Sequence, residues 1–160
     1  MADNSPEVSI IMNCYNGEEF LEQAIQSVIN QSFTNWEIIF WDNLSQDQSK
    51  IIFKSFDDAR LKYHLADTHT PLYEARNFAI KKSKGQYLAF LDVDDYWEHN
   101  KLEKQLPLFN NSKVGFVCSN YLIQHELKRK SWIAFKKEIP SGFVTDELLS
   151  SYFIGLLTLM

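Results

Sequence analysis

The strongest structural signal in the chain is the segment Gly85-Gln86-Tyr87-Leu88-Ala89-Phe90-Leu91-Asp92-Val93-Asp94-Asp95. Residues 86–91 form an apolar, β-favouring run that shows no polar alternation after its first residue. Such a run is typical of a strand that is buried on both faces of a mainly parallel sheet. The segment therefore predicts an α/β fold built around a parallel sheet.

Three carboxylates, Asp92, Asp94 and Asp95, follow this expected strand within four positions. Carboxylates this close repel one another unless a cation lies among them. Ligands of open α/β sheets bind beyond the carboxyl ends of the strands, where Asp92 and Asp94 would lie. The pattern predicts a metal and phosphate site, and the alternative is a solvated turn that caps a helix. The spacing and the glycine of an EF-hand calcium loop are absent.

Length and composition limit the class of protein. A chain of 160 residues is expected to form one domain with a substantial core. Its net charge of -5 does not favour a nucleic-acid partner, because binding to a phosphate backbone needs a basic face. Residues 1–7 lack the features of a secretory signal and are expected to be loosely held. No apolar run reaches the roughly 18 residues of a membrane span.

Cys14 and Cys118 both lie in apolar runs, and their spacing suggests neither a zinc site nor a disulfide framework. We therefore expect a reduced, cytoplasmic setting, either free or at the inner face of the membrane. The four histidines show no spacing typical of a zinc site.

Strand and helix signals alternate along the rest of the chain. Further strands are expected over residues 8–14, 36–41, 61–65 and 114–121. Helices are expected between them and over 97–109, with Asn16, Ser45 and Thr70 as N-caps and Gly85 at one helix end. This alternation favours a mainly parallel sheet with helices on both faces.

Polar residues follow three of the expected strands, in the loops Cys14-Tyr15-Asn16, Asp42-Asn43 and Asp92-Val93-Asp94. Right-handed crossovers would bring all three loops to the same carboxyl edge of the sheet. A pocket there would offer an aromatic ring, hydrogen-bonding groups and a cation site, which suits a nucleotide bearing a diphosphate. Ordinary packing of the tyrosine and a turn role for the asparagine remain the alternatives.

Four motifs, taken in order, resemble the family 2 inverting glycosyltransferases with a GT-A (Rossmann-like) fold. They are VSIIMNCYNG at 8–17, WDNLSQD at 41–47, EARN at 74–77 and FLDVDD at 90–95. The resemblance covers residues 8–121 and implies a nucleotide-sugar-binding core there. It implies transfer of a sugar, with inversion, from a nucleotide-diphosphate sugar, most often a UDP-sugar, to a glycan or lipid-linked acceptor. Manganese or magnesium is the implied cofactor, and polysaccharide biosynthesis is the implied setting.

The resemblance also assigns residues on the metal side of the site. Asp92 and Asp94 match the Asp-any-Asp motif around Val93, with Asp94 as the direct metal ligand and Asp92 beside it, facing the ribose or sugar. Arg76 matches an arginine expected close to the donor, where its fixed charge would meet phosphate. An ion pair with a neighbouring carboxylate is the alternative for this arginine.

The base side of the site follows from the same resemblance. Tyr15, flanked by Cys14 and Asn16, resembles the residue that packs near the base. Asp42 and Asn43 occupy the place where the family usually has two acidic residues. An amide donates as well as accepts hydrogen bonds, so Asn43 bears on which base is bound.

The general base of the family lies well after the Asp-any-Asp motif, and we expect it beyond residue 160. Asp146 and Glu147 are better explained by the start of a helix. Residues 122–160 are accordingly expected to begin an acceptor-side region that is truncated. The alternative function is a domain that binds nucleotide sugar and metal without turnover. A receiver-like signalling domain is disfavoured, because it would need an acidic pair where Tyr15-Asn16 stands.

Basic and aromatic residues mix between positions 128 and 137. A solvated hairpin is the favoured interpretation, and contact with an anionic membrane surface is the alternative. Self-association into a homodimer is a further expectation for the partners of this chain.

Overall fold

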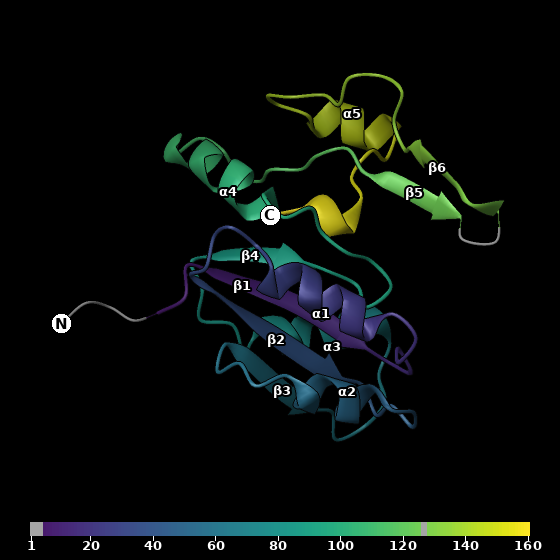
Figure 1. Ribbon diagram of the computed structural model, residues 1–160. Coiled ribbons are helices and arrows are strands. Elements are labelled where there is room, and N and C mark those ends of the chain that lie inside the picture. The colour runs from purple at the N-terminus through teal and green to yellow at the C-terminus, as the bar shows by residue number, and fades with distance from the viewer. Residues whose placement is uncertain (1–4, 126–127) are drawn as a thin grey trace.

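A four-stranded parallel sheet forms the centre of the computed structural model, which describes residues 5–125 and 128–160 (Figure 1). The strand order is β3-β2-β1-β4, and every neighbouring pair is parallel. The strands are β1 (Val8–Cys14), β2 (Trp36–Asp42), β3 (Leu61–Leu65) and β4 (Tyr87–Phe90). The predicted α/β class with a mainly parallel sheet is therefore confirmed.

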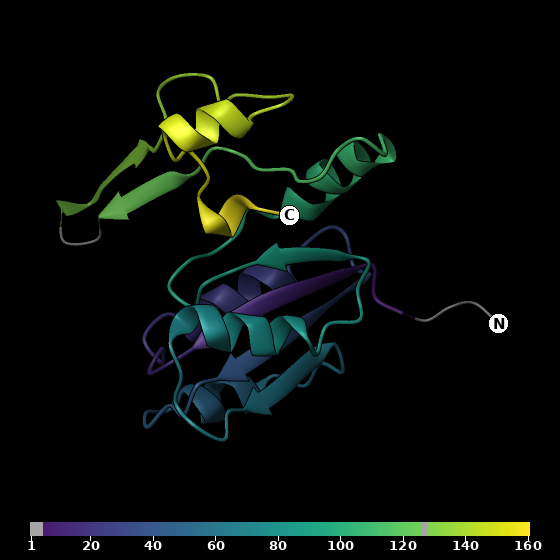
Figure 2. The same cartoon turned by 180° about the vertical axis from the view of Figure 1, so that it is seen from behind.

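Helices cover both faces of this sheet. The connecting helices are α1 (Leu21–Ile29), α2 (Ser49–Ser55) and α3 (Leu72–Ile80). One face packs a large apolar core against α1 and α2, and the other packs a smaller one against α3, as the opposite views of Figures 1 and 2 show. All seven residues of β1 are buried, because side chains of alternate parity enter the two cores.

The strand expected to be buried on both faces lies instead at an edge of the sheet. Within the described part of the chain, β4 pairs with β1 alone, and Ala89 is its one fully buried residue. The short 3-10 helix η3 (Leu156–Thr158) lies against β4. An apolar run indicates burial but cannot tell a central strand from a covered edge, so this part of the prediction was wrong.

The three predicted side-chain N-caps do not form. Asn16 accepts a hydrogen bond at Oδ1 from the Gln46 backbone at 2.8 Å, and Ser45 Oγ accepts one from the Asn16 backbone at 3.0 Å. Thr70 Oγ1 lies 3.4 Å from Asn43 Oδ1. The three side chains connect loops from different parts of the chain, which local sequence spacing does not reveal.

The C-terminal third departs further from expectation. The helix expected over 97–109 is observed as α4 (Lys101–Gln105) followed by the 3-10 helix η1 (Leu106–Asn110). Within the described chain, residues 114–121 form no strand; Val117 exchanges two backbone hydrogen bonds of 2.9 Å with Met160 instead. Two backbone bonds at one residue give a local contact and not a sheet.

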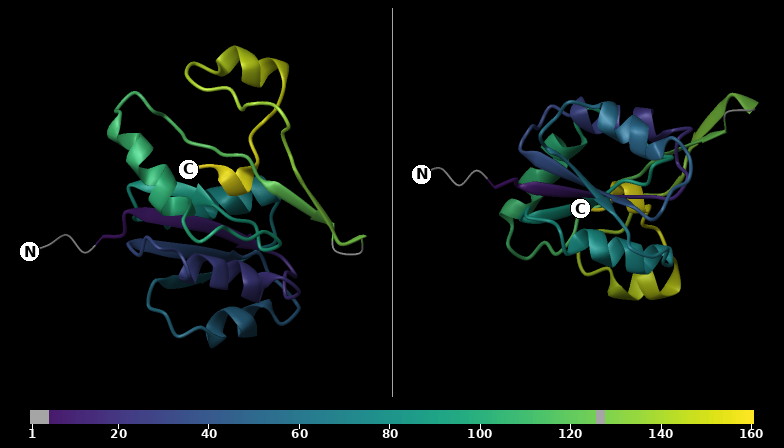
Figure 3. Two further views of the ribbon diagram at one scale, coloured as in Figure 1. Left: turned by 45° about the horizontal axis from the view of Figure 1, so that its top comes forward. Right: turned by 90° about the horizontal axis from the view of Figure 1, so that it is seen from below.

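An antiparallel hairpin, with strands β5 (Leu122–His125) and β6 (Lys130–Ile133), precedes α5 (Thr145–Ser150). The predicted hairpin is confirmed on either side of residues 126–127, which lie outside the described residues. The hairpin and α5 stand beyond the β4 edge, on the side away from β3 (Figures 1 and 3). Across the described ranges, none of the helices has the length and apolar character needed to cross a bilayer.

The first residues are partly described. Residues 1–4 of the expected loose segment 1–7 lie outside the described part of the chain. The backbone N–H of Glu7 donates to Asn35 O at 3.0 Å, which fixes the chain where it enters β1.

Candidate functional site

The three loops singled out in the sequence meet at the carboxyl edge of the sheet. The Asn43 backbone N–H donates to Cys14 O at 2.8 Å, which joins the loops after β1 and β2. A Cβ added to Gly17 would lie 2.6 Å from Val93 Cγ2, so the loop after β4 packs tightly against the first loop. The parallel order of the strands produces this convergence, because it brings their carboxyl ends together.

Backbone N–H groups of the first loop are held by side chains of the second. Ser45 Oγ accepts from Asn16 N and Ser49 Oγ accepts from Gly17 N, both at 3.0 Å. Asn16 takes a φ of 55°, in the left-handed region that asparagine tolerates better than most residues. The loop that carries Tyr15 is therefore fixed before any ligand binds.

Tyr15 presents an open aromatic surface. Its side chain is 52% exposed, and its ring centroid lies 4.4 Å from that of His69. His69 Nδ1 in turn lies 3.0 Å from Asn43 O. His69 was not predicted as a site residue, because its place beside Tyr15 depends on how the loop between β3 and α3 packs on the loop after β1.

Asn43 is buried, and its amide is already engaged. Nδ2 donates to Thr70 O at 2.7 Å, and Oδ1 accepts from Thr70 N at 3.2 Å. The side chain thus joins the loop after β2 to the segment that enters α3. This geometry agrees with a structural role of Asn43 in the loop, which was the alternative to ligand contact.

Asp42 ends β2 as a carboxylate that is only 1% exposed. Its Oδ1 accepts from Ser45 N at 2.7 Å, and its Oδ2 accepts from the Tyr63 hydroxyl at 2.5 Å. Burial, together with the hydrogen bond and the charge of Asp42, raises the pKa of Tyr63. Tyr63 was missed by the sequence analysis, because only the register of β3 on β2 brings it to Asp42.

Replacing Tyr63 with phenylalanine is expected to lower the free energy of unfolding by about 2 kcal/mol, because Asp42 would lose a buried, charge-assisted hydrogen bond. The raised pKa adds a pH dependence: above pH ~10 the unfolded tyrosine ionises while the folded one does not, so wild-type stability falls. Urea unfolding at pH 7.5 and 10.5 measures both effects. The exposed Tyr73 provides the control, and equal losses in Tyr73→Phe would contradict the prediction.

Cys14 lies inside the core and not in the open site. Its side chain is buried, with Sγ 3.7 Å from Ser45 Oγ, and burial raises the pKa of the thiol. A buried thiol in this state packs as a small apolar group. Cys14 therefore affects the loop after β1 through packing.

Arg76 reaches from α3 to the loop after β4. Its Nη2 forms an ion pair with Asp92 Oδ1 at 2.8 Å, and both side chains are partly exposed. This is the carboxylate pairing that the sequence left as the alternative for Arg76. Asp94 is exposed, and Val93 packs on Gly17 between the two acids.

Asp95 is the third acid of the loop and is partly buried. Its backbone N–H donates to Asp92 O at 3.1 Å. Burial, followed by the charges of Asp94 and Asp92, raises the pKa of Asp95 to about 6. Burial is thus the main reason that the Asp95 carboxyl resists ionisation, and the crowding inferred from the sequence adds to it.

Replacing Asp95 with asparagine is expected to stabilise the protein by about 1 kcal/mol at pH 7.5, after allowance for solvent screening. The Asp95 carboxyl is neutral in both states only below its unfolded pKa of about 4, so its destabilising effect grows between about pH 4 and the folded pKa of about 6 and is constant above it. Urea unfolding at pH 4 and 7.5 measures the difference. An equal gain at both pH values would contradict this origin.

The acidic loop can supply part of a divalent-cation site. Carboxylate oxygens are the ligands that magnesium and manganese prefer. Across residues 5–125 and 128–160, no three His, Cys, Asp or Glu side chains are arranged to hold a metal ion. Magnesium commonly binds through one or two carboxylates completed by phosphate oxygens and water, so the donor set fits a cation that arrives with a phosphate ligand.

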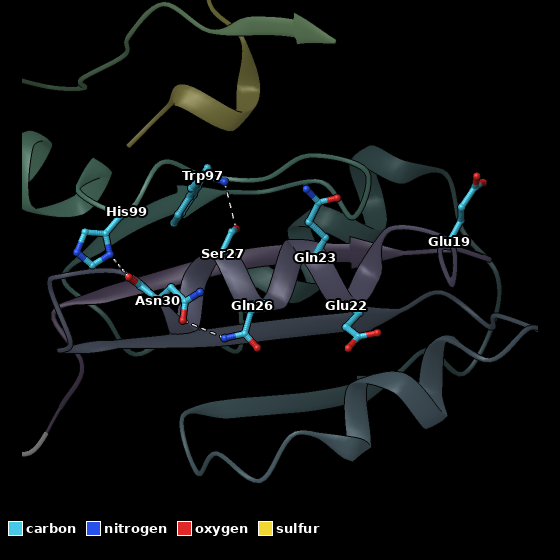
Figure 4. Close-up of a pocket in the computed structure, with 8 residues that line it drawn as sticks. All are labelled: Glu19, Glu22, Gln23, Gln26, Ser27, Asn30, Trp97 and His99. Carbon is cyan, nitrogen blue, oxygen red and sulfur yellow. Dashed lines mark hydrogen bonds between the residues drawn. The ribbon is translucent and has the colours of Figure 1, made fainter. Parts of the chain in front are cut away.

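Two hollows lie on the surface around α1, and one of them includes residues of the acidic loop. The larger has a volume of about 910 Å³ and includes Asp94 and Asp95, with walls from α1, α4, β5 and η3. The smaller, of about 600 Å³, lies along the polar side of α1 (Figure 4). There, Trp97 N donates to Ser27 Oγ at 3.1 Å, and none of the site residues predicted from sequence lines it. The larger hollow is therefore the one that adjoins the acidic loop.

Comparisons of sequence place these features in a family. The profile of "Glycosyl transferase family 2" matches residues 9–155. The chain is 35% identical over 153 residues to the Escherichia coli UDP-Glc:alpha-D-GlcNAc-diphosphoundecaprenol beta-1,3-glucosyltransferase WfgD, covering 96% of this chain and 59% of WfgD. It is 32% identical over 164 residues to the putative teichuronic acid biosynthesis glycosyltransferase TuaG of Bacillus subtilis, covering 100% of this chain and 64% of TuaG.

Solved structures give the same result for the fold. S. aureus TarS 1-349 in complex with UDP-GlcNAc matches with a TM-score of 0.63 at 26% identity, over 69% of this chain and 33% of TarS. The mannosyltransferase PcManGT from Pyrobaculum calidifontis, in complex with GDP-Man and Mn2+, matches with a TM-score of 0.66 at 19% identity, over 73% of this chain and 36% of that one. With its parallel sheet and its acidic loop after β4, this chain belongs to glycosyl transferase family 2.

Proposed function

We propose that this chain binds the donor in the transfer of a sugar from a nucleotide-diphosphate sugar to a glycan or lipid-linked acceptor, with inversion. The observation that carries the proposal is the convergence of Tyr15, Asp42 and the pair Asp92 and Asp94 at one edge of the sheet. The names of WfgD and of the TarS complex support a UDP-sugar as donor. The chain spans about 60% of the length of these curated relatives, so the activity of the whole protein is part of the proposal.

The base and the diphosphate would occupy different ends of this edge. The exposed face of Tyr15 suits stacking of a base, and the fixed loop behind it lowers the ordering cost of binding. Asp42 is buried and bonded to Tyr63 and Ser45, so it would hold the loop shape more than it would reach the ligand. Arg76, paired with Asp92, would add positive charge on the side of the diphosphate.

Asp94 and Asp92 would hold a divalent cation, manganese or magnesium. When bound, such a cation acts as a Lewis acid that stabilises negative charge on a departing diphosphate. The exposed Asp94 carboxylate is available for this role, and Asp92 would have to share its oxygens between the cation and Arg76. Attack by an acceptor hydroxyl from the opposite face requires a carboxylate that takes up its proton.

A second candidate function is binding of nucleotide sugar and metal without turnover. It is favoured by the position of Asp146 and Glu147, the acids expected late in the chain. Both are exposed in the first turn of α5, where the helix dipole and solvent account for them. The proton acceptor that inversion needs would then have to come from elsewhere.

Titration calorimetry with UDP tests the binding proposal, in the presence and absence of manganese. We expect binding that requires manganese, and UDP binding that is equally weak in both conditions would overturn the proposal. Incubation with UDP-glucose and a soluble GlcNAc-diphosphate-lipid analogue then separates the two candidates. Release of UDP with product formation supports transfer, whereas tight metal-dependent binding without turnover supports the second candidate.

A further inference from the structure

The β5–β6 hairpin concentrates positive charge on an acidic protein. Five of the 16 basic residues of the chain lie between positions 128 and 137, a stretch without any acidic residue, although the net charge is -5. All five side chains are exposed. They are Lys128, Arg129, Lys130, Lys136 and Lys137. Charge segregated in this way favours an anionic partner at the hairpin.

The same hairpin exposes apolar side chains. Trp132 is 46% exposed and lies opposite Ile123, which is 37% exposed. Two residues away in the ladder, Lys130 lies opposite His125. Because side chains two positions apart share a face of a strand, the exposed tryptophan and a basic residue are presented together.

Of the four residues paired on this outer face, Ile123 lines the cleft beside Asp94, and Trp132, His125 and Lys130 do not. Leu122 and Ile133 pair with each other on the opposite side of the ladder, and both line that cleft. The hairpin can therefore meet a partner through Trp132 and Lys130, which lie outside the cleft lining.

We propose that the outer face of the hairpin docks on the surface of a bilayer containing anionic lipids. A tryptophan among lysine and arginine side chains is the composition of an interfacial contact, in which the ring enters the headgroup region and the charges meet lipid phosphates. The inference deepens the proposed function and rests on it in one respect: a lipid-linked acceptor lies in a membrane. Docking through the hairpin would bring the neighbouring cleft close to such an acceptor.

Vesicle sedimentation tests the charge contribution. The 160-residue chain is mixed with vesicles of phosphatidylcholine alone or with phosphatidylglycerol added, and binding is expected only with phosphatidylglycerol. Each basic residue near such a surface contributes about a factor of five. The triple variant Lys128→Gln, Arg129→Gln, Lys130→Gln is therefore expected to bind about a hundredfold more weakly. Raising the salt concentration should also weaken the binding of the wild-type protein to these vesicles, because salt screens the charges.

A matched variant removes the same charge elsewhere. Lys81, Lys82 and Lys84 are exposed beyond the end of α3, and their triple replacement by glutamine should leave vesicle binding unchanged. Equal losses in both triple variants would overturn the proposal, since net charge and not the hairpin would then govern binding. Failure of the wild-type protein to bind phosphatidylglycerol vesicles would also overturn it.

Tryptophan fluorescence tests the position of the ring. Trp36 and Trp97 are buried, and Trp41 is half-buried and stacked on Phe78, whereas Trp132 is 46% exposed. A blue shift on addition of phosphatidylglycerol vesicles should therefore come from Trp132 and disappear in Trp132→Phe. A shift that persists in this variant would contradict docking through the hairpin. UDP and manganese binding is also measured on the wild-type protein and on the hairpin variants, which should retain it. In the wild-type protein, nucleotide binding without vesicle binding overturns this inference alone, and vesicle binding without nucleotide binding overturns the proposed function alone.

Discussion

Replacing Asp94 with alanine is expected to abolish the manganese-dependent part of UDP binding, with a loss of at least about a hundredfold in affinity. Changes to groups that only support a metal ligand already cost about 10- to 100-fold, so removal of a ligand should reach the upper end or beyond. Asp94 is exposed, in a loop that Val93 and Gly17 pack in place. The substitution should therefore leave the fold intact, and calorimetry with UDP at saturating manganese measures the effect.

Asp57 provides a matched control for this experiment. It is an exposed aspartate that follows α2 and precedes β3, at the opposite edge of the sheet from the acidic loop. Asp57→Ala removes the same charge and should bind UDP and manganese as the wild-type protein does. A hundredfold loss of UDP affinity in both variants would mean that the overall charge of the protein governs binding. An unchanged affinity in Asp94→Ala would remove Asp94 from the metal site.

Replacing Gly85 with alanine is expected to produce the largest loss of stability among single methyl additions to the glycines of this chain. The new Cβ would lie 2.5 Å from Ser9 N and 2.8 Å from Val8 C, both of them backbone atoms of the central strand β1. Neither atom can rotate away, so the chain before β4 must shift. We expect a loss of about 3 kcal/mol and a fall in Tm of roughly 10 °C.

A buried polar cluster makes this position more sensitive. Ser9 Oγ donates to Glu37 Oε1 at 2.7 Å and accepts from Gly85 N at 2.8 Å, and Lys84 N donates to the same carboxylate oxygen at 2.8 Å. Movement of Gly85 would leave these buried groups without hydrogen-bond partners. Each unsatisfied group would lower the free energy of unfolding by about 1–3 kcal/mol.

Gly115→Ala is the control for Gly85→Ala. A Cβ at Gly115 meets nothing within 4 Å, so its stability should match that of the wild-type protein. Thermal unfolding of the two variants, followed by circular dichroism, makes the comparison. Similar melting temperatures for both would contradict the close approach of Gly85 to β1. Gly85 was predicted to end a helix, but α3 already ends at Ile80, so its role is to allow this approach.

The sheet could be predicted from the sequence because β1, β2 and β4 are mainly apolar runs and the weaker β3 is a short β-favouring segment. β1 and β3 follow the predicted bounds, and β2 extends one residue further, to Asp42. The same kind of run at 114–121 failed as a strand. Among residues 5–125 and 128–160, Met160 is the one backbone partner of Val117, and an apolar pattern carries no information about whether a neighbouring strand exists.

The acidic loop and its neighbours could be identified as a candidate site because polar residues directly follow buried strands. The contacts that shape the site could not be predicted. Tyr63 reaches Asp42 through strand register, and Asn43 forms hydrogen bonds with Thr70, which follows it in the chain only after α2 and β3. His69 lies beside Tyr15 for the same reason. Such pairings depend on the folded arrangement of distant segments, which residue spacing does not encode.

The most direct test of the account is a crystal structure of the chain with UDP and manganese, in which anomalous scattering locates the metal. The account predicts a manganese peak at about 2.2 Å from a carboxylate oxygen of Asp94, with diphosphate oxygens completing its coordination. It also predicts the uracil ring beside Tyr15. A metal bound away from the loop after β4, or a nucleotide seated outside the edge formed by Tyr15 and Asp42, would contradict it.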